Sequence, residues 1–343
     1  MLISANLKFN YKQWLVMATA LFVIAFSCKG WSKDVSVLQS KPVFKLEIEA
    51  YGLVYSVSVN GGRVFNEFDP DSQISVDLPV NQWMHPESGE FNTLILPKQG
   101  ETEFSDSSFL HVTLLVQDFD NKDISYRLPL IMFDGSQYKS NKEMEKSLIK
   151  GRYHLADNNE VKMGRGDIEL GSINKTKTKY ADTARIYSRK VVIPNSLPLW
   201  AFFNSDTLPD YNAMSPAEYK KSIKQIFTAY KKVQDILIKG DVEELVKIFA
   251  ERSREADLAF YQKPGTMSDN VKRLTHQFID DKDWALQIRT ADGLGLMPYD
   301  NNKLVSLVMG LDSGALGFAK ENGSYYGLEI IFRREDGEWI VTR

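Results

Sequence analysis

Four histidines and one cysteine are the residues of this 343-residue chain that most readily bind transition metals or act as nucleophiles. The histidines do not have the spacing that places two metal ligands on one face of a helix. A structural zinc site needs four such ligands brought together. We therefore expect no metal site and no cofactor. The four histidines are His85, His111, His154 and His276.

Three aspartates crowd one loop between two expected strands, at Asp118, Asp120 and Asp123. Their carboxylates are the hard oxygen ligands that calcium prefers. However, Lys122 lies within the loop, which also lacks the glycine of an EF-hand turn. The preferred interpretation is a solvated hairpin loop.

Cys28 directly follows an uncharged apolar run from Trp14 to Phe26, which Lys8 and Lys12 precede. As a helix this run would be about 20 Å long, shorter than the roughly 30 Å of a bilayer core. A short apolar run behind positive charges is typical of a secretory signal. The sequence therefore predicts an exported protein.

The segment Ala25-Phe26-Ser27-Cys28 resembles the lipobox of bacterial lipoproteins. This resemblance implies that residues 1–28 are a signal peptide with a lipobox and that Cys28 is lipidated. The membrane would then be a partner through the lipid anchor. Lys29 replaces the aspartate that often retains lipoproteins at the inner membrane, which favours the periplasmic side of the outer membrane. The alternatives are ordinary cleavage after Ser27 or Ser32, giving a soluble periplasmic protein, and an uncleaved membrane anchor.

The composition is that of an ordinary globular protein, with 43% apolar and 25% charged residues. The formal net charge is −3. Because a broad nucleic-acid surface normally requires a basic excess, we expect no nucleic-acid partner. One cysteine cannot form an intrachain disulfide, so the folded chain must be held together by its hydrophobic cores.

Strand patterns begin after a polar tether at residues 29–42. Phe44, Leu46 and Ile48 alternate with charged residues, and Asn60-Gly61 is a strong hairpin-turn signal. Further short alternating segments continue to residue 193. We expect residues 43–193 to form an antiparallel β-sandwich domain.

Three segments of this region resemble the galactose-binding-like jelly roll. They are Val57-Ser58-Val59-Asn60-Gly61, Leu78-Pro79-Val80-Asn81 and Gly89-Glu90-Phe91-Asn92-Thr93-Leu94. The resemblance covers about residues 43–100. It implies a sandwich, with carbohydrate binding as a distant possibility.

Residues 194–214 combine three prolines with apolar residues that include Trp200 and Phe202. Proline interrupts regular structure, whereas large apolar side chains favour burial. We therefore expect an ordered linker packed between two domains.

Residues 215–343 are expected to form an α+β domain in which helices come first and an antiparallel meander follows. Ser215, Pro216 and Glu218 form the capping signature of a first helix, and Gly240 can end it. A second apolar stripe extends from Val242 to Ala256. Ser268 is expected to cap a third helix.

Two segments of this half resemble the NTF2-like (SnoaL-like) superfamily. They run from Lys239 to Phe249 and from Phe332 to Val341. The resemblance implies helices packed inside a strongly curved sheet, a cone that in this superfamily serves enzymes and non-catalytic binding proteins alike.

Aromatic residues could line the mouth of this cone. The candidate ligand-binding residues are Tyr230, Phe260, Tyr261, Trp284, Tyr299, Tyr325 and Tyr326. No catalytic set is evident. The leading hypothesis is a non-catalytic cell-envelope lipoprotein that binds an envelope protein or a small molecule. The alternatives are an enzyme acting on a small apolar or carbohydrate ligand in the cone, and a periplasmic immunity or inhibitor protein.

Overall fold

The N-terminal half of the described chain is built from eleven strands, and long strands such as Pro42–Tyr51 and Ser88–Leu96 alternate buried and more exposed side chains. The computed structural model describes residues 36–69, 71, 73–178, 182–287, 289–299, 302–309 and 313–343. The predicted signal peptide, Cys28 and the first part of the tether lie outside the described residues. The strands are β1 (Pro42–Tyr51), β2 (Val54–Val59), β3 (Gly62–Glu67), β4 (Ile74–Pro79), β5 (Ser88–Leu96), β6 (Phe109–Asp118), β7 (Ser125–Asp134), β8 (Gly151–Ala156), β9 (Glu160–Met163), β10 (Ile168–Lys177) and β11 (Arg185–Val192).

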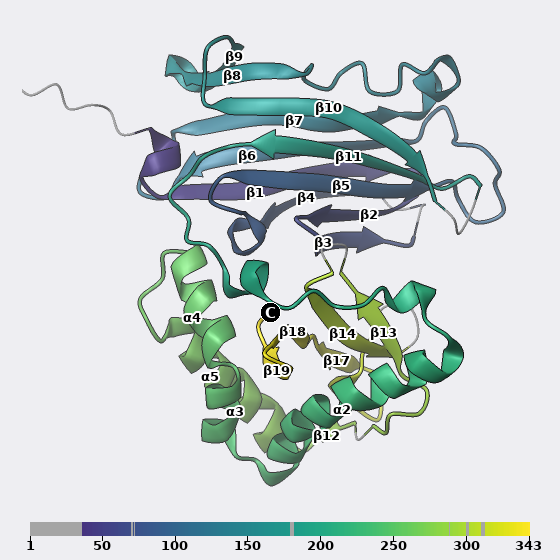
Figure 1. The fold of residues 1–343 in the computed structure, drawn as a ribbon, viewed down its shortest axis with the longest axis vertical. Helices are drawn as coiled ribbons and strands as arrows, with labels where there is room; N and C mark the ends of the chain where they lie inside the picture. The colour runs from purple at the N-terminus through teal and green to yellow at the C-terminus, as the bar shows by residue number, and fades with distance from the viewer. Residues whose placement is uncertain are drawn as a thin grey trace, which may run out of the picture.

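These strands form two antiparallel sheets, with the orders β4-β1-β6-β7 and β3-β2-β5-β11-β10-β8-β9. Inward side chains of both sheets, such as Leu46 of β1 and Val57 of β2, belong to one hydrophobic core. In the upper part of Figure 1 the two sheets are seen face-on, one behind the other. The predicted β-rich N-terminal half is therefore confirmed, and its arrangement is sandwich-like.

The predicted hairpin turn at Asn60-Gly61 joins β2 to β3. Both residues have positive φ, 49° and 78°. These values are typical of a type I′ turn, whose twist matches that of the flanking strands.

Residues 36–41 of the predicted tether are packed against the sandwich. Val37–Gln39 form the 3₁₀ helix η1, capped by the Ser36 hydroxyl. Val37 and Leu38 are buried in the core described above. This part of the segment is therefore more structured than its polar composition indicates.

Residues 194–214 contain no α-helix or strand but pack closely. Leu197, Trp200 and Phe202 are buried in the same core as the strands. The 3₁₀ helices of the described chain are η2 (Asn81–Trp83), η3 (Gly135–Ser140), η4 (Asp157–Asn159), η5 (Ala201–Asn204) and η6 (Tyr211–Ala213), besides η1.

The C-terminal half begins with α2 (Pro216–Lys239), which has the predicted capping box at Ser215 and Glu218 and ends at Gly240 with φ 67°. The predicted second helix is interrupted at Phe249, which gives α3 (Val242–Ile248) and α4 (Ala250–Ala259). The last helix, α5 (Thr266–Asp280), has Gly265 as its N-cap instead of the predicted Ser268, which lies within the first turn.

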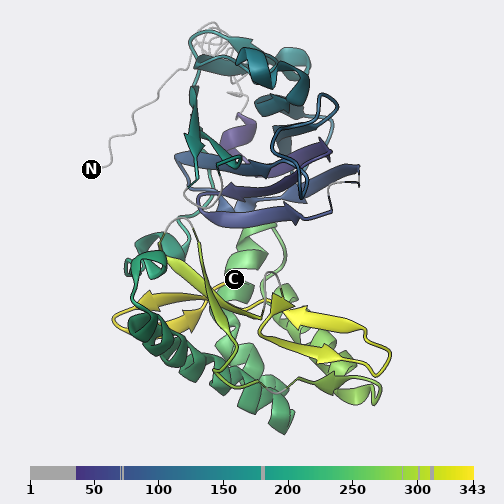
Figure 2. The same ribbon diagram turned by 90° about the vertical axis from the view of Figure 1, so that its right-hand side faces the viewer.

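Two small antiparallel sheets complete this half, with the orders β12-β16-β17 and β13-β14-β18-β19, and β15 pairs with β14. The helices lie along one side of these strands (Figures 1 and 2). The fold is thus mixed α+β. The strands are β12 (Ala285–Leu286), β13 (Gly295–Pro298), β14 (Leu304–Met309), β15 (Ser313–Gly314), β16 (Leu316–Ala319), β17 (Tyr325–Leu328), β18 (Ile331–Glu335) and β19 (Glu338–Val341).

Asn81 connects the two halves. Its Oδ1 accepts a hydrogen bond from the Phe44 amide at 2.6 Å, and its Nδ2 donates to the carbonyls of Pro42 and Ala259, both at 2.8 Å. The backbone carbonyl of Asn81 also accepts from the Trp200 indole at 3.0 Å. One buried side chain therefore joins β1 to the end of α4.

Within the described residues, no helix combines the length and apolar content needed to cross a bilayer.

Candidate functional site

A cavity of about 250 Å³ lies between the helices and strands β16 and β17 of the C-terminal half. We call it the helix–sheet cavity. Its wall is mostly apolar, because the inward stripes of the helices face it. Its apolar lining includes Val233, Leu237, Leu245, Phe249, Val271, Leu274, Phe278 and Phe318.

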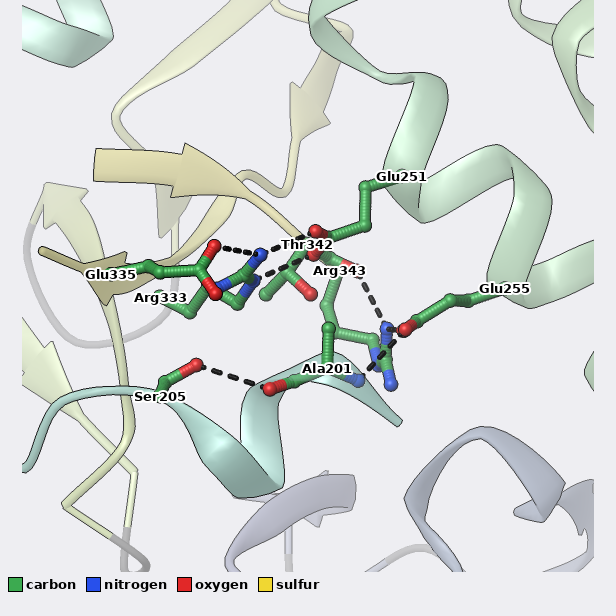
Figure 3. A network of polar contacts seen from close by, with 8 residues as sticks. All are labelled: Ala201, Ser205, Glu251, Glu255, Arg333, Glu335, Thr342 and Arg343. Carbon is green, nitrogen blue, oxygen red and sulfur yellow. Dashed lines mark hydrogen bonds and ion pairs between the residues drawn. The ribbon is translucent and has the colours of Figure 1, made fainter. Parts of the chain in front are cut away.

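Helix α4 forms one wall and is held in place by Glu251. This carboxylate accepts hydrogen bonds from Arg333 Nε at 2.8 Å and Arg333 Nη2 at 2.6 Å. Arg333 Nη2 also donates to Glu335 at 2.9 Å (Figure 3). Burial alone would raise the pKa of Glu251, but Arg333 holds this pKa below its ordinary value of 4.5. Glu251 is therefore ionised at neutral pH, and the pair connects α4 to β18.

Glu255, one turn further along α4, forms a second buried ion pair. Its Oε2 accepts from Arg343 Nη1 at 2.6 Å, and its Oε1 accepts from the Ala201 amide at 2.8 Å. Figure 3 shows these groups converging between α4, η5 and the end of β19. The Arg343 guanidinium also lies 4.8 Å from the ring centre of Phe202. Residues four apart on one helix face thus fix the position and rotation of α4.

Asp257 connects α4 to α5. Its carboxylate accepts hydrogen bonds from the amides of Gly265 at 2.7 Å and Met267 at 2.9 Å. These donors lie at the start of α5, where helix amides have no intrahelical partner. Asp257 therefore caps the neighbouring helix and holds two walls of the cavity together.

Two charged side chains of the described chain lie on the cavity wall, Arg252 and Glu329. Arg252 is partly buried on α4 and lies 5.4 Å from the ring centre of Phe249. Glu329 follows β17, and its Oε1 accepts a hydrogen bond from the Tyr299 hydroxyl at 3.2 Å. Burial, followed by the nearby Glu329 charge, raises the pKa of Tyr299.

A second hollow of about 370 Å³ lies between the two halves, and we call it the interface groove. It shares Arg252, Met267 and Glu329 with the helix–sheet cavity. Because these residues line both spaces, the two hollows adjoin at Arg252. The remaining lining of the groove consists of Arg63, Val64, Leu78, Pro79, Gln82, Trp83, Ala256, Phe260, Ile331 and Arg343.

The structure does not bring the seven predicted pocket residues to one place. Tyr326 lines the helix–sheet cavity, and Phe260 lines the interface groove. Tyr325 lines a third hollow of about 410 Å³, whose lining also includes Arg63 and Glu329.

The other four predicted residues pack within the fold. Tyr230 is buried, with its ring centre 6.0 Å from that of Phe332. Trp284 packs edge-on against Phe278. Tyr261 donates to the Pro42 carbonyl, and Tyr299 stacks on Trp83 between the two halves.

The predicted pocket residues do not include Arg252 or Glu329. Arg252 lies three residues after Phe249 and four before Ala256, so it interrupts the second predicted apolar stripe. A charged residue on an apolar helix face was therefore a visible signal. The sequence pattern did not indicate Glu329, because this residue lies between strands β17 and β18 and not on an apolar helix face.

No group of three or more His, Cys, Asp or Glu side chains in the described part of the chain could hold a metal ion. In the predicted hairpin loop, Asp118 Oδ1 accepts from the amides of Asp120 and Asn121. Asp120 also pairs with Lys41 at 2.9 Å. The carboxylates of Asp118 and Asp120 thus have partners within the protein.

No family model, curated protein or solved structure matches this chain. The lipobox, jelly-roll and NTF2-like resemblances therefore remain predictions from sequence motifs.

Proposed function

We propose that this protein is a non-catalytic binding protein of the cell envelope and that the helix–sheet cavity holds a small ligand. The observation that carries the proposal is the cavity itself, which has a mostly apolar wall and few polar groups. This composition is typical of small-molecule sites, although about 250 Å³ lies just below the usual range of roughly 300–1,000 Å³. A compact ligand is therefore favoured.

The NTF2-like resemblance supports this location. Helices α2 to α5 precede the meander, and the cavity lies between the helices and β16–β17. In an NTF2-like cone, the helices and the curved sheet would enclose such a space. A lipid on Cys28 would place the binding protein at the outer membrane, facing the periplasm.

Binding of the neutral apolar fluorophore 1-aminoanthracene tests the cavity. We expect saturable fluorescence enhancement with the native protein. Leu274→Trp, which fills the cavity wall, should abolish it. Leu258→Trp is the matched control, because Leu258 is 47% exposed on α4. Equal binding by both variants would place the fluorophore elsewhere and contradict the proposal.

The anchor is tested separately by cell fractionation. Cys28→Ser should release the protein from membrane pellets into the soluble periplasm, and mass spectrometry should find the lipid on Cys28 of the native protein. Soluble native protein without a lipid would contradict anchoring while leaving the binding proposal intact.

A second candidate is an enzyme, which Glu329 favours because it lies on the cavity wall near Tyr326. A carboxylate within reach of a bound ligand could act as a general base. If Glu329 is a general base, the native protein should consume its substrate. The Glu329→Gln variant should still bind the substrate but leave it unconverted. Unchanged ligand recovered from the native protein would support the binding role.

A further inference from the structure

The polar contacts of Arg252 differ from those of the buried arginines Arg189, Arg333 and Arg343. Arg333 donates to two carboxylates, and Arg343 pairs with Glu255. Arg189, deep in the sandwich, donates to three backbone carbonyls. Among the described residues, the Arg252 guanidinium has no hydrogen-bond acceptor and no carboxylate within 4.0 Å.

A partly buried cation without an acceptor is unfavourable, because it loses hydration without gaining a partner. Burial lowers the pKa of Arg252 below its ordinary value, and the charge of Glu329 partly offsets this effect. An arginine nevertheless stays protonated in proteins. The charge therefore remains, and because Glu329 acts on it only from beyond 4.0 Å, the hydrogen-bond donors of the guanidinium are left for an added anion.

The position of Arg252 defines what kind of anion could reach it. Arg252 lines both the interface groove and the helix–sheet cavity. The cavity continues from it as an apolar space lined by residues such as Leu245, Leu274 and Phe278. A ligand with an anionic head and an apolar chain matches both parts.

We propose that Arg252 binds the anionic head of a small amphipathic ligand, a medium-chain carboxylate, whose apolar chain lies in the helix–sheet cavity. This inference rests on the proposed binding function and specifies its ligand class. Guanidinium and carboxylate groups form paired, charge-assisted hydrogen bonds, which would satisfy Arg252. The groove would give the head group access to solvent.

Three ligands with the same ten-carbon chain test the proposal by displacement of 1-aminoanthracene: decanoate, decanol and decyltrimethylammonium. With the native protein, decanoate should bind at least tenfold more tightly than decanol, and the cation should bind most weakly. Arg252→Gln should remove the preference for decanoate, whereas Arg252→Lys should retain part of it. Arg254→Gln is the matched control, because Arg254 is exposed two residues away on α4.

A structural role for Arg252 would give a different result. If the side chain mainly stabilised the fold, Arg252→Gln would lower the unfolding temperature without ligand. We expect it to be unchanged or higher, because an unsatisfied charge is removed. Equal binding of decanoate and decanol, displacement by neither, or a preference that survives in Arg252→Gln would overturn the ligand class. Failure of 1-aminoanthracene itself to bind would instead overturn the proposed binding function, and the ligand class with it.

Discussion

Glu255 and Arg343 form a buried ion pair in which Oε2 and Nη1 are 2.6 Å apart, with side chains only 4% and 7% exposed. Glu255 lies on α4 and Arg343 follows β19, so the pair connects the helix wall of the cavity to the end of the sheet. Its position next to Phe202 brings residues of η5 into the same contact. The pair therefore fixes the position of α4 through contacts that lie outside the helix–sheet cavity.

Arg343→Gln should lower the free energy of unfolding by about 3–5 kcal/mol, because it leaves the Glu255 carboxylate buried without its cation. Urea titration at pH 7 measures this loss. The combined change Glu255→Gln and Arg343→Met should cost less than the sum of the two single changes, since no uncompensated charge remains. Lys231→Gln, in the exposed pair with Asp235, should cost under about 1 kcal/mol. Equal losses for Arg343→Gln and Lys231→Gln would show that the buried pair contributes little.

Glu251 should make stability depend on acid pH. Its pKa is lower in the folded protein than its ordinary value of 4.5. The stabilisation is therefore present above about pH 4.5 and is lost as the pH falls through the folded-state pKa. Glu251→Gln should be less stable than the native protein at pH 7, and the difference should shrink below pH 4.5. Denaturant titrations across this range measure it. Glu243→Gln, which changes a 72% exposed carboxylate, is the matched control.

Asn81→Ala should destabilise the protein by at least about 2 kcal/mol. It removes three side-chain hydrogen bonds and leaves the Phe44 amide and the Pro42 and Ala259 carbonyls without this partner. Asn174→Ala, at an exposed position of β10, should be nearly neutral. Calorimetry of thermal unfolding also tests the connection between the halves. If Asn81 connects them, the unfolding transition of Asn81→Ala should be broader than that of the native protein or split into two. An unchanged single transition at the native temperature would refute this role.

The features that the sequence predicted correctly are local. Alternation in Phe44, Leu46 and Ile48 produces a strand, and Asn60-Gly61 produces a hairpin turn, because neighbouring residues determine both. The capping box at Ser215 depends on contacts across three residues. The mixed α+β order followed from these signals.

The candidate site depended on long-range contacts, which the sequence does not display. Tyr261 and Tyr299 are aromatic residues of the C-terminal half, yet they pack against the N-terminal half at Pro42 and Trp83. The predicted second helix is interrupted at Phe249, three residues before Arg252 of the cavity wall. The packing of Tyr261 and Tyr299 and the helix interruption do not follow from periodicity, because they depend on which segments pack together.

The orientation of α2 is tested by comparing its two faces. Ile226 is fully buried and belongs to the core of the C-terminal half, so Ile226→Ala should cost about 2–5 kcal/mol. Phe227 is only partly buried, and Phe227→Ala should cost less than the roughly 3–5 kcal/mol of a fully buried phenylalanine.

Lys232 is exposed on the same helix, and Lys232→Ala should change stability by less than about 0.5 kcal/mol. Urea titration of the full chain gives all three values under one condition. The expected order of loss is Ile226→Ala, Phe227→Ala, then Lys232→Ala, because it follows the burial of each side chain. If Lys232→Ala were as costly as Ile226→Ala, α2 would pack through a different face, and the cavity wall formed by Val233 and Leu237 would be wrong as well.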